Sequence, residues 1–140
     1  MSVVKSLDSE TIAAIATPRA AGALAVIRVS GKNAREIVGQ CLAGGGKTSV
    51  NRFGAERKSC LRVVNDEEGR RIDECLVVWY GGPRSFTGED VVELSCHGGL
   101  YGSRRVLERV LENGARLARS GEFSERAYMN GKLDLTQAEA

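Results

Sequence analysis

One strand-like run carries the polar side chains whose types and spacing could do chemistry. Residues 84–99 read R-S-F-T-G-E-D-V-V-E-L-S-C-H-G-G. With a side-chain period of two, Glu93, Ser95 and His97 share one face of this run. The opposite face is apolar and consists of Val92, Leu94 and Cys96. A carboxylate, a hydroxyl and the only histidine of the chain, aimed away from a core and followed by a Gly-Gly turn, predict a wall that binds a ligand.

The spacing of the cysteines and the histidine argues against catalysis and metal binding. Cys96 and His97 are neighbours on a strand, so their side chains point to opposite faces and do not form a catalytic pair. The four cysteines include no C-x-x-C pair, the usual sign of a zinc site. Cys75 and Cys96 are instead predicted as core residues in a reducing compartment. We predict no catalytic residue and no metal ligand. His97 is interpreted as structural, with a ligand contact as the alternative.

The composition predicts one domain with its own core. The chain has 140 residues, of which 42% are hydrophobic. Its 20 basic and 18 acidic side chains give a net charge of +2, which is too balanced to indicate nucleic acid or anionic lipid. The sequence has no apolar run of ~18 residues and no secretory signal, so a cytoplasmic protein that does not span the membrane is expected.

Hydrophobic periodicity predicts an α+β fold, a mixed β-sheet with helices packed mainly on one face. The expected order is strand, strand, helix, three strands, helix, strand, helix, over residues 11–16, 23–30, 34–42, 60–64, 72–80, 91–97, 99–113, 115–118 and 122–129. The apolar run 75–79 is expected to be a central strand that is buried on both faces.

The helices are predicted to carry recognisable local signals. Asn33 and Glu36 resemble a capping box, and Gly44 begins the glycine run that ends the same helix. On the helix after Gly99, opposite charges at helical spacing predict the ion pairs Arg104–Glu108 and Arg109–Glu112. The arginines of that helix are interpreted first as a solvated face. A nucleic-acid patch is the alternative for Arg104, Arg105 and Arg109.

Two further segments affect the domain organisation. Residues 41–48 read C-L-A-G-G-G-K-T, which lacks the first glycine of a phosphate-binding loop and follows a helix where such a loop follows a strand. Nucleotide binding there is rejected. Residues 136–139 form a capping box for a new helix just before the chain stops. We therefore expect a fragment, with a domain over 1–130 and the start of a helical domain over 131–140.

Four blocks resemble one family. They are T-I-A-A-I-A-T-P at 11–18, I-R-V-S-G at 27–31, S-F-T-G-E-D-V-V-E-L-S-C-H-G-G at 85–99 and G-E-F-S-E-R-A-Y-M-N-G-K-L-D-L-T-Q-A-E-A at 121–140. They are similar to the N-terminal part of the tRNA-modification GTPases called MnmE or TrmE. The resemblance implies a fold like the folate-binding domain of the glycine-cleavage T-protein. It also implies a homodimer that holds a 5-formyltetrahydrofolate-type one-carbon carrier near its interface.

Carried over by motif, the folate contacts of this family fall on Arg28, Glu93 and Lys132. By residue type alone, Arg28 in an otherwise apolar run is first interpreted as a strand-end arginine that reaches solvent or forms an ion pair. A carboxylate can accept hydrogen bonds from the neighbouring N–H and amino groups of a pterin, and cations can pair with its carbonyl and with the glutamyl carboxylates of a folate.

The chain departs from the family in its turn at 18–22, which is poorer in glycine, and at Ser120, where the family has proline.

For the longer parent protein, the resemblance implies GTP hydrolysis with potassium and magnesium, tRNA as substrate and the flavin-dependent partner MnmG, also called GidA. These 140 residues are expected not to hydrolyse GTP. Two alternatives stay open. One alternative to the folate-binding domain is a structural dimerisation module without a ligand site, and the other is an aminomethyltransferase-like folate enzyme.

Overall fold

The computed structural model describes residues 10–16, 24–44 and 52–132. Its frame is a six-stranded sheet with the order β3-β4-β5-β2-β1-β6. All neighbouring strands are antiparallel except β1 and β6, which run parallel. The strands are β1 (Ile12–Ile15), β2 (Ala25–Ser30), β3 (Cys60–Asn65), β4 (Arg71–Tyr80), β5 (Val91–Cys96) and β6 (Arg116–Leu117).

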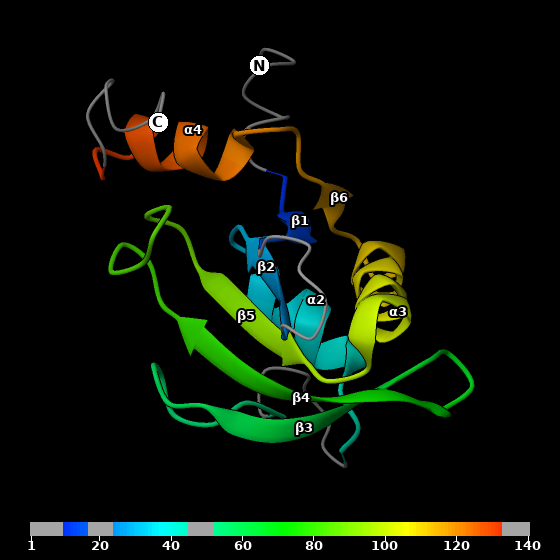
Figure 1. Ribbon diagram of the computed structural model, residues 1–140. Coiled ribbons are helices and arrows are strands. Elements are labelled where there is room, and N and C mark those ends of the chain that lie inside the picture. The colour runs from blue at the N-terminus through cyan, green and yellow to red at the C-terminus, as the bar shows by residue number, and fades with distance from the viewer. Residues whose placement is uncertain (1–9, 17–23, 45–51, 133–140) are drawn as a thin grey trace.

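The described helices are α2 (Ala34–Cys41), α3 (Gly99–Glu112) and α4 (Glu122–Met129). α2 and α3 contact each other and pack on one face of the sheet, whereas α4 lies across the end of β1 and β2, near the loop that joins β4 and β5 (Figure 1). The predicted α+β class and the predicted order of elements are confirmed. None of the described helices is long and apolar enough to cross a membrane.

The core lies between the sheet and the helix pair α2 and α3. Alternate residues of the central strands point into it, for example Ile27, Val29 and Leu94, which are fully buried beside Val106 and Val110 of α3. Each such side chain contributes about 1.5–3 kcal/mol through its burial. The prediction that Cys75 and Cys96 are core residues is also confirmed.

The opposite face of the sheet, called the outer face here, is covered only in part. Ser30 and Val91 pair across β2 and β5 and are buried. One row further along, Arg28 and Glu93 are half-buried. In the next row Leu76 of β4 pairs with Ser95 and is 38% exposed. Burial therefore decreases along the outer face away from α4.

One expectation about an individual element is wrong, and the end of one helix is shifted by one residue. The run 75–79 is not buried on both faces, because Leu76 and half-buried Val78 point to the outer face, which α2 and α3 do not cover. The first helix has the predicted start and ends at Cys41, one residue before the predicted Leu42. Leu42 instead turns into an extended conformation and forms an antiparallel bridge with Val64, so a tertiary contact ends the helix earlier than the glycine signal predicted.

Two local electrostatic expectations are also corrected. Asn33 is the N-cap of α2, but its side chain makes no capping hydrogen bond, so the capping box is not formed. On α3 the partner of Glu108 is Arg105, whose Nη1 lies 2.9 Å from a carboxylate oxygen, and not Arg104. The second predicted pair is confirmed, with 3.8 Å between Arg109 and Glu112.

Three segments singled out in the sequence fall outside the described residues: the turn at 18–22, positions 45–48 of the partial phosphate-loop match, and the helix start at 136–139.

Candidate ligand-binding site

Arg28 and Glu93 form an ion pair across β2 and β5. The two residues are directly opposite in the strand register. Nε and Nη2 of Arg28 each lie 3.0 Å from Oε2 of Glu93, and the side chains are 25% and 26% exposed. The period-two pattern assigned Glu93 to the polar face. The strand pairing adds that Arg28, 65 residues away in sequence, lies beside it.

The pair leaves a donor and an acceptor free. Both contacts of Arg28 go to Oε2, and no residue that the structure describes hydrogen-bonds to its Nη1 or to Oε1 of Glu93. The charges of Arg28 and Glu93 compensate each other, so the pair itself has no net charge to attract an ion. It is suited to a neutral group that carries an N–H next to a carbonyl, because the carboxylate accepts from the first and the guanidinium donates to the second.

Aromatic rings flank the guanidinium of Arg28. The ring centroid of Phe86 lies 4.9 Å from Cζ of Arg28, and that of Phe123 lies 5.7 Å away. Phe86 comes from the β4–β5 loop and is 43% exposed, and Phe123 comes from α4. The residue-level interpretation of the sequence missed both rings. A signal was present, because the chain has only three phenylalanines and two of them lie here.

Two clefts meet at Phe86. The first has a volume of about 390 Å³ and the second about 310 Å³. Glu93 and Lys132 line the first cleft, Arg28 lines the second, and Phe86 lines both. The three residues that the family resemblance indicates are therefore gathered around one ring. The other lining residues of the first cleft are Arg57, Tyr80, Arg84, Ser85 and Val91, and those of the second are Ala14, Ile15, Ala16, Ala118, Arg119, Ser120, Gly121, Phe123 and Ser124.

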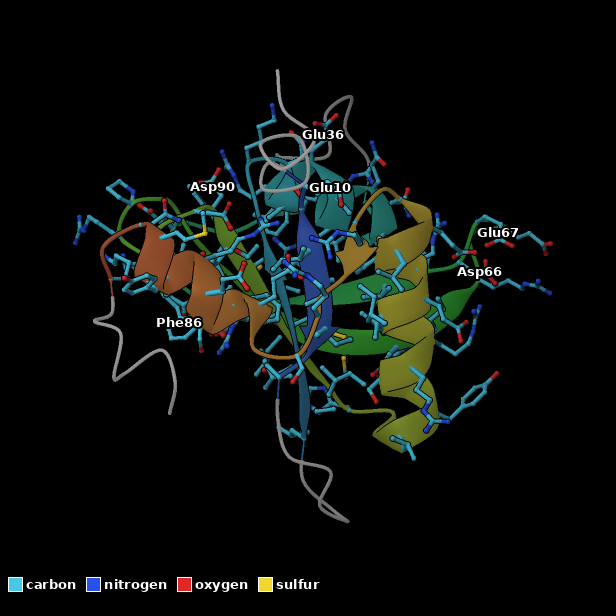
Figure 2. All side chains as sticks on the ribbon, turned by 90° about the horizontal axis from the view of Figure 1, so that it is seen from above. Glu10, Glu36, Asp66, Glu67, Phe86 and Asp90 are labelled. Atoms are coloured by element: carbon cyan, nitrogen blue, oxygen red, sulfur yellow. The ribbon has the colours of Figure 1, made fainter. Side chains whose placement is uncertain are left out.

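A buried polar network holds the β4–β5 loop, and with it Phe86, against the sheet. The hydroxyls of Ser30 and Thr87 are 2.7 Å apart, and Ser30 donates to Glu89 at 2.8 Å. Arg126 of α4 contacts both oxygens of Glu89 at 3.1 Å. Figure 2 shows Phe86 on the α4 side of the molecule, far from Asp66 at the other end. The network thus joins β2, the loop and α4 into one wall.

Gly88 in this loop permits the close approach of the segment that follows α4. Its φ is +84°, and a Cβ atom there would lie 2.8 Å from Cβ of Asn130 and 3.5 Å from Cγ of Lys132. The side chain of Asn130 donates to the carbonyl of Thr87 at 2.9 Å. A residue larger than glycine would therefore clash with Asn130 and displace the segment that carries Lys132.

Glu122 anchors the start of α4. It is 2% exposed and accepts hydrogen bonds from Arg116 at 2.6 and 3.0 Å and from the backbone N–H of Arg119 at 2.8 Å. Burial alone would raise the pKa of Glu122, but the hydrogen bonds from Arg116 and Arg119 lower it from 4.5 to about 2. The same contacts, led by the hydrogen bond that Arg116 donates to Glu122, raise the pKa of Arg116. The sequence analysis missed this carboxylate, although its position at a helix start is a typical signal.

The other polar residues of the opening run lie elsewhere. The exposed His97 has Nδ1 2.7 Å from the carbonyl oxygen of Glu74, and neither it nor Ser95 lines the two clefts. Of the arginines considered for nucleic acid, Arg105 and Arg109 contact carboxylates of α3, while Arg104 is exposed.

Asp73, Cys75 and Cys96 form a buried group with metal-ligand atoms within 4.8 Å of one another. The carboxylate of Asp73 already accepts backbone N–H groups of residues 74, 97 and 98 at 2.8–2.9 Å, which caps the start of α3. The Sγ atoms of the two cysteines are 3.7 Å apart. The hydrogen bond to Cys96 and burial raise the pKa of Cys75, which disfavours the thiolate that a metal requires. The group therefore fits a structural role.

Pockets that bind small organic ligands occupy roughly 300–1,000 Å³. The two clefts beside the Arg28–Glu93 pair, of about 390 and 310 Å³, fall in this range. The structure is therefore that of an α+β domain with room for a small organic ligand. A family model described as "GTP-binding protein TrmE N-terminus" matches residues 11–132, so the chain belongs to this family.

Relatives named "tRNA modification GTPase MnmE" match nearly the whole chain. The protein of Salinibacter ruber is 48% identical over 133 residues, which is 95% of this chain and 28% of the relative. That of Chlamydia caviae is 47% identical over 134 residues, or 96% of this chain and 29% of the relative. That of Porphyromonas gingivalis is 43% identical over 140 residues, or 100% of this chain and 29% of the relative. The chain thus spans less than a third of these relatives and corresponds to their N-terminal domain.

Proposed function

We propose that the chain binds a reduced folate of the 5-formyltetrahydrofolate type in the clefts around Phe86. The observation that carries this proposal is the Arg28–Glu93 pair, which is half-buried between two clefts and has a free acceptor and a free donor. The family membership of the chain supports the same ligand, since these two residues and Lys132 match the folate contacts that the resemblance implies.

The chemistry of a pterin fits the atoms that are free. Its ring N–H and exocyclic amino group can donate to Oε1 of Glu93, which is open and has two lone pairs, whereas Oε2 is already bonded to Arg28. Its ring carbonyl can accept from Nη1 of Arg28. The planar parts of the ligand can stack on Phe86, and a glutamyl carboxylate can pair with Lys132 in the first cleft.

Isothermal titration calorimetry with 5-formyltetrahydrofolate tests this proposal. Glu93→Gln keeps the shape of the side chain but removes its charge, and we expect affinity to fall at least about tenfold, because a charged hydrogen bond contributes about 1.5–3 kcal/mol. The exposed Glu36→Gln, on α2, is the matched control and should bind as the wild type does. An unaltered affinity of Glu93→Gln, or no binding heat from folded wild-type chain, would refute the proposal.

We further propose that the uncovered part of the outer face is the surface of a homodimer. Leu61 and Leu76 pair across β3 and β4 and are 50% and 38% exposed, and Leu24 near the same face is 50% exposed. Exposed apolar patches of this kind mark association sites. Leu61→Glu with Leu76→Glu should convert a dimer to a monomer in light scattering, whereas Leu117→Glu on β6 should not. A monomeric wild type at high concentration would remove this proposal.

In the whole protein we propose that this domain serves a tRNA-modification GTPase in the cytoplasm. GTP hydrolysis with potassium and magnesium, tRNA and the partner MnmG would then belong to parts beyond these 140 residues. A purely structural dimerisation module predicts a dimer without folate binding heat. An aminomethyltransferase-like enzyme predicts turnover of a folate by this chain alone, so a folate turnover assay separates it from the other two.

A further inference from the structure

The described side chains that line the first cleft carry a net positive charge, and Lys132 accounts for only part of it. Arg57, Arg84 and Lys132 all line it. Among the residues that the structure describes, none of these three forms an ion pair with a carboxylate. Glu93 is the only acid among the described residues that line the cleft, and Arg28 already compensates its charge. A ligand that fills this cleft would therefore meet an uncompensated cationic rim.

Arg57 is held against the backbone of Arg84, and both residues line the first cleft. The guanidinium of Arg57 donates a hydrogen bond to the backbone carbonyl of Arg84 and stacks on Tyr80, with Cζ 5.4 Å from the ring centroid. The backbone N–H of Arg57 donates to the carbonyl of Trp79 at 2.9 Å. Arg57 also has a φ of +68°, a conformation that is uncommon for a residue with a side chain. Such backbone strain persists where surrounding contacts impose it, and it is concentrated at ligand-binding positions.

The second cleft offers no such rim. Its arginine at the rim, Arg119, contacts the carboxylates of Glu122 and Glu125 at 3.3 and 3.5 Å, so its charge is largely compensated. If the ring system of a folate lies at Arg28 and Glu93, an anionic extension of the ligand has one favourable direction, into the first cleft towards Lys132 and beyond it.

We propose that Arg57 and Arg84 bind the carboxylates of a poly-γ-glutamate tail, so that the preferred ligand is a polyglutamylated folate. This proposal rests on the proposed folate site. Lys132 takes a carboxylate of the first glutamate, and the arginine pair takes those of the following residues. Arginine suits this task because its planar fork of N–H groups matches a carboxylate.

Calorimetry with 5-formyltetrahydrofolate that carries one or five glutamates tests the tail site. The wild type should bind the pentaglutamate about fivefold to tenfold more tightly, as expected for two exposed cation–carboxylate contacts. Arg57→Gln with Arg84→Gln should bring this ratio close to one. Arg71→Gln with Arg104→Gln, two exposed arginines outside the cleft, should keep it. Far-ultraviolet circular dichroism checks that each variant is folded.

A second measurement needs no variant. Raising sodium chloride from about 0.05 M to about 0.5 M should reduce the pentaglutamate preference of the wild type, because exposed charges are screened over a shorter distance. Equal affinities for the two ligands at low salt would overturn the tail site and leave the folate proposal standing. Binding of neither ligand would refute the folate proposal, and the tail site with it. An equal loss of affinity for both ligands in the double variant would assign the arginines to the common part of the ligand and overturn their role in binding the tail.

Discussion

Neutralising Glu122 should destabilise the chain in a way that depends on pH. This carboxylate is 2% exposed and bonds to Arg116 and Arg119, and its pKa in the folded state is about 2 against an ordinary 4.5. At ~1.36 kcal/mol per unit of pKa, this difference corresponds to about 3 kcal/mol of stability at neutral pH. Glu122→Gln keeps the shape and one acceptor oxygen, so we expect a loss of about 2–3 kcal/mol at pH 7.

The sign of the pH dependence follows from the direction of the pKa change. Because the folded-state pKa is lowered, the contribution of Glu122 is fully present above its unfolded pKa of 4.5 and is lost as pH falls towards about 2. At pH 3 about 1.4 kcal/mol of the contribution should remain. The difference between wild type and Glu122→Gln should therefore be less than half as large at pH 3 as at pH 7.

Urea unfolding at both pH values, followed by circular dichroism, measures this difference. Glu125→Gln is the matched control, since that carboxylate is 49% exposed and, among the described residues, forms an ion pair only with Arg119, at 3.5 Å. It should change stability by less than about 0.5 kcal/mol at either pH. A difference between Glu122→Gln and wild type that stays constant from pH 7 to pH 3 would show that the reasoning is wrong, as would a control variant that loses as much stability as Glu122→Gln.

Three further expectations concern the core side of the sheet. Asp73→Ala should lower the free energy of unfolding by about 2–3 kcal/mol in urea titrations, because the N–H groups that start α3 lose their acceptor. At pH 8 the half-buried Cys60 should react with a disulfide reagent at least about tenfold faster than the buried Cys75, as peptide mass spectrometry can measure. Arg35→Gln should cost about 0.5–1 kcal/mol and alter the emission of Trp79, since the guanidinium lies 3.8 Å from its ring centroid.

Local pattern predicted the elements well and their contacts poorly. Period two separated the core face of β5 from the face of Glu93, because the pleat of a strand depends only on the strand itself. The neighbour of Glu93 across the sheet depends on strand order and register, which are decided across a sequence separation of 65 residues. Arg28 was thus correctly suspected of an ion pair, but its partner was not identifiable from the pattern.

Two of the residues that the sequence analysis missed lie where periodicity gives no information. Phe86 and Glu89 belong to a loop, and a loop has no repeating geometry that assigns its side chains to a face. Their positions follow from contacts with β2 and α4, through Thr87 and Arg126. The early end of α2 has the same origin, since the bridge between Leu42 and Val64 overrides the local glycine signal.

The half-buried position of Arg28 and Glu93 is itself a reason to expect binding. A fully exposed pair of this kind would contribute little, because water screens the two charges. A fully buried pair would need all its polar atoms satisfied and would leave none for a ligand. This pair is about a quarter exposed, has flanking aromatic rings and keeps an oxygen and a nitrogen unbonded among the described residues. It lies where the cover by α4 and the β4–β5 loop ends, so a ligand there would complete the hydrogen bonding that the fold leaves unfinished.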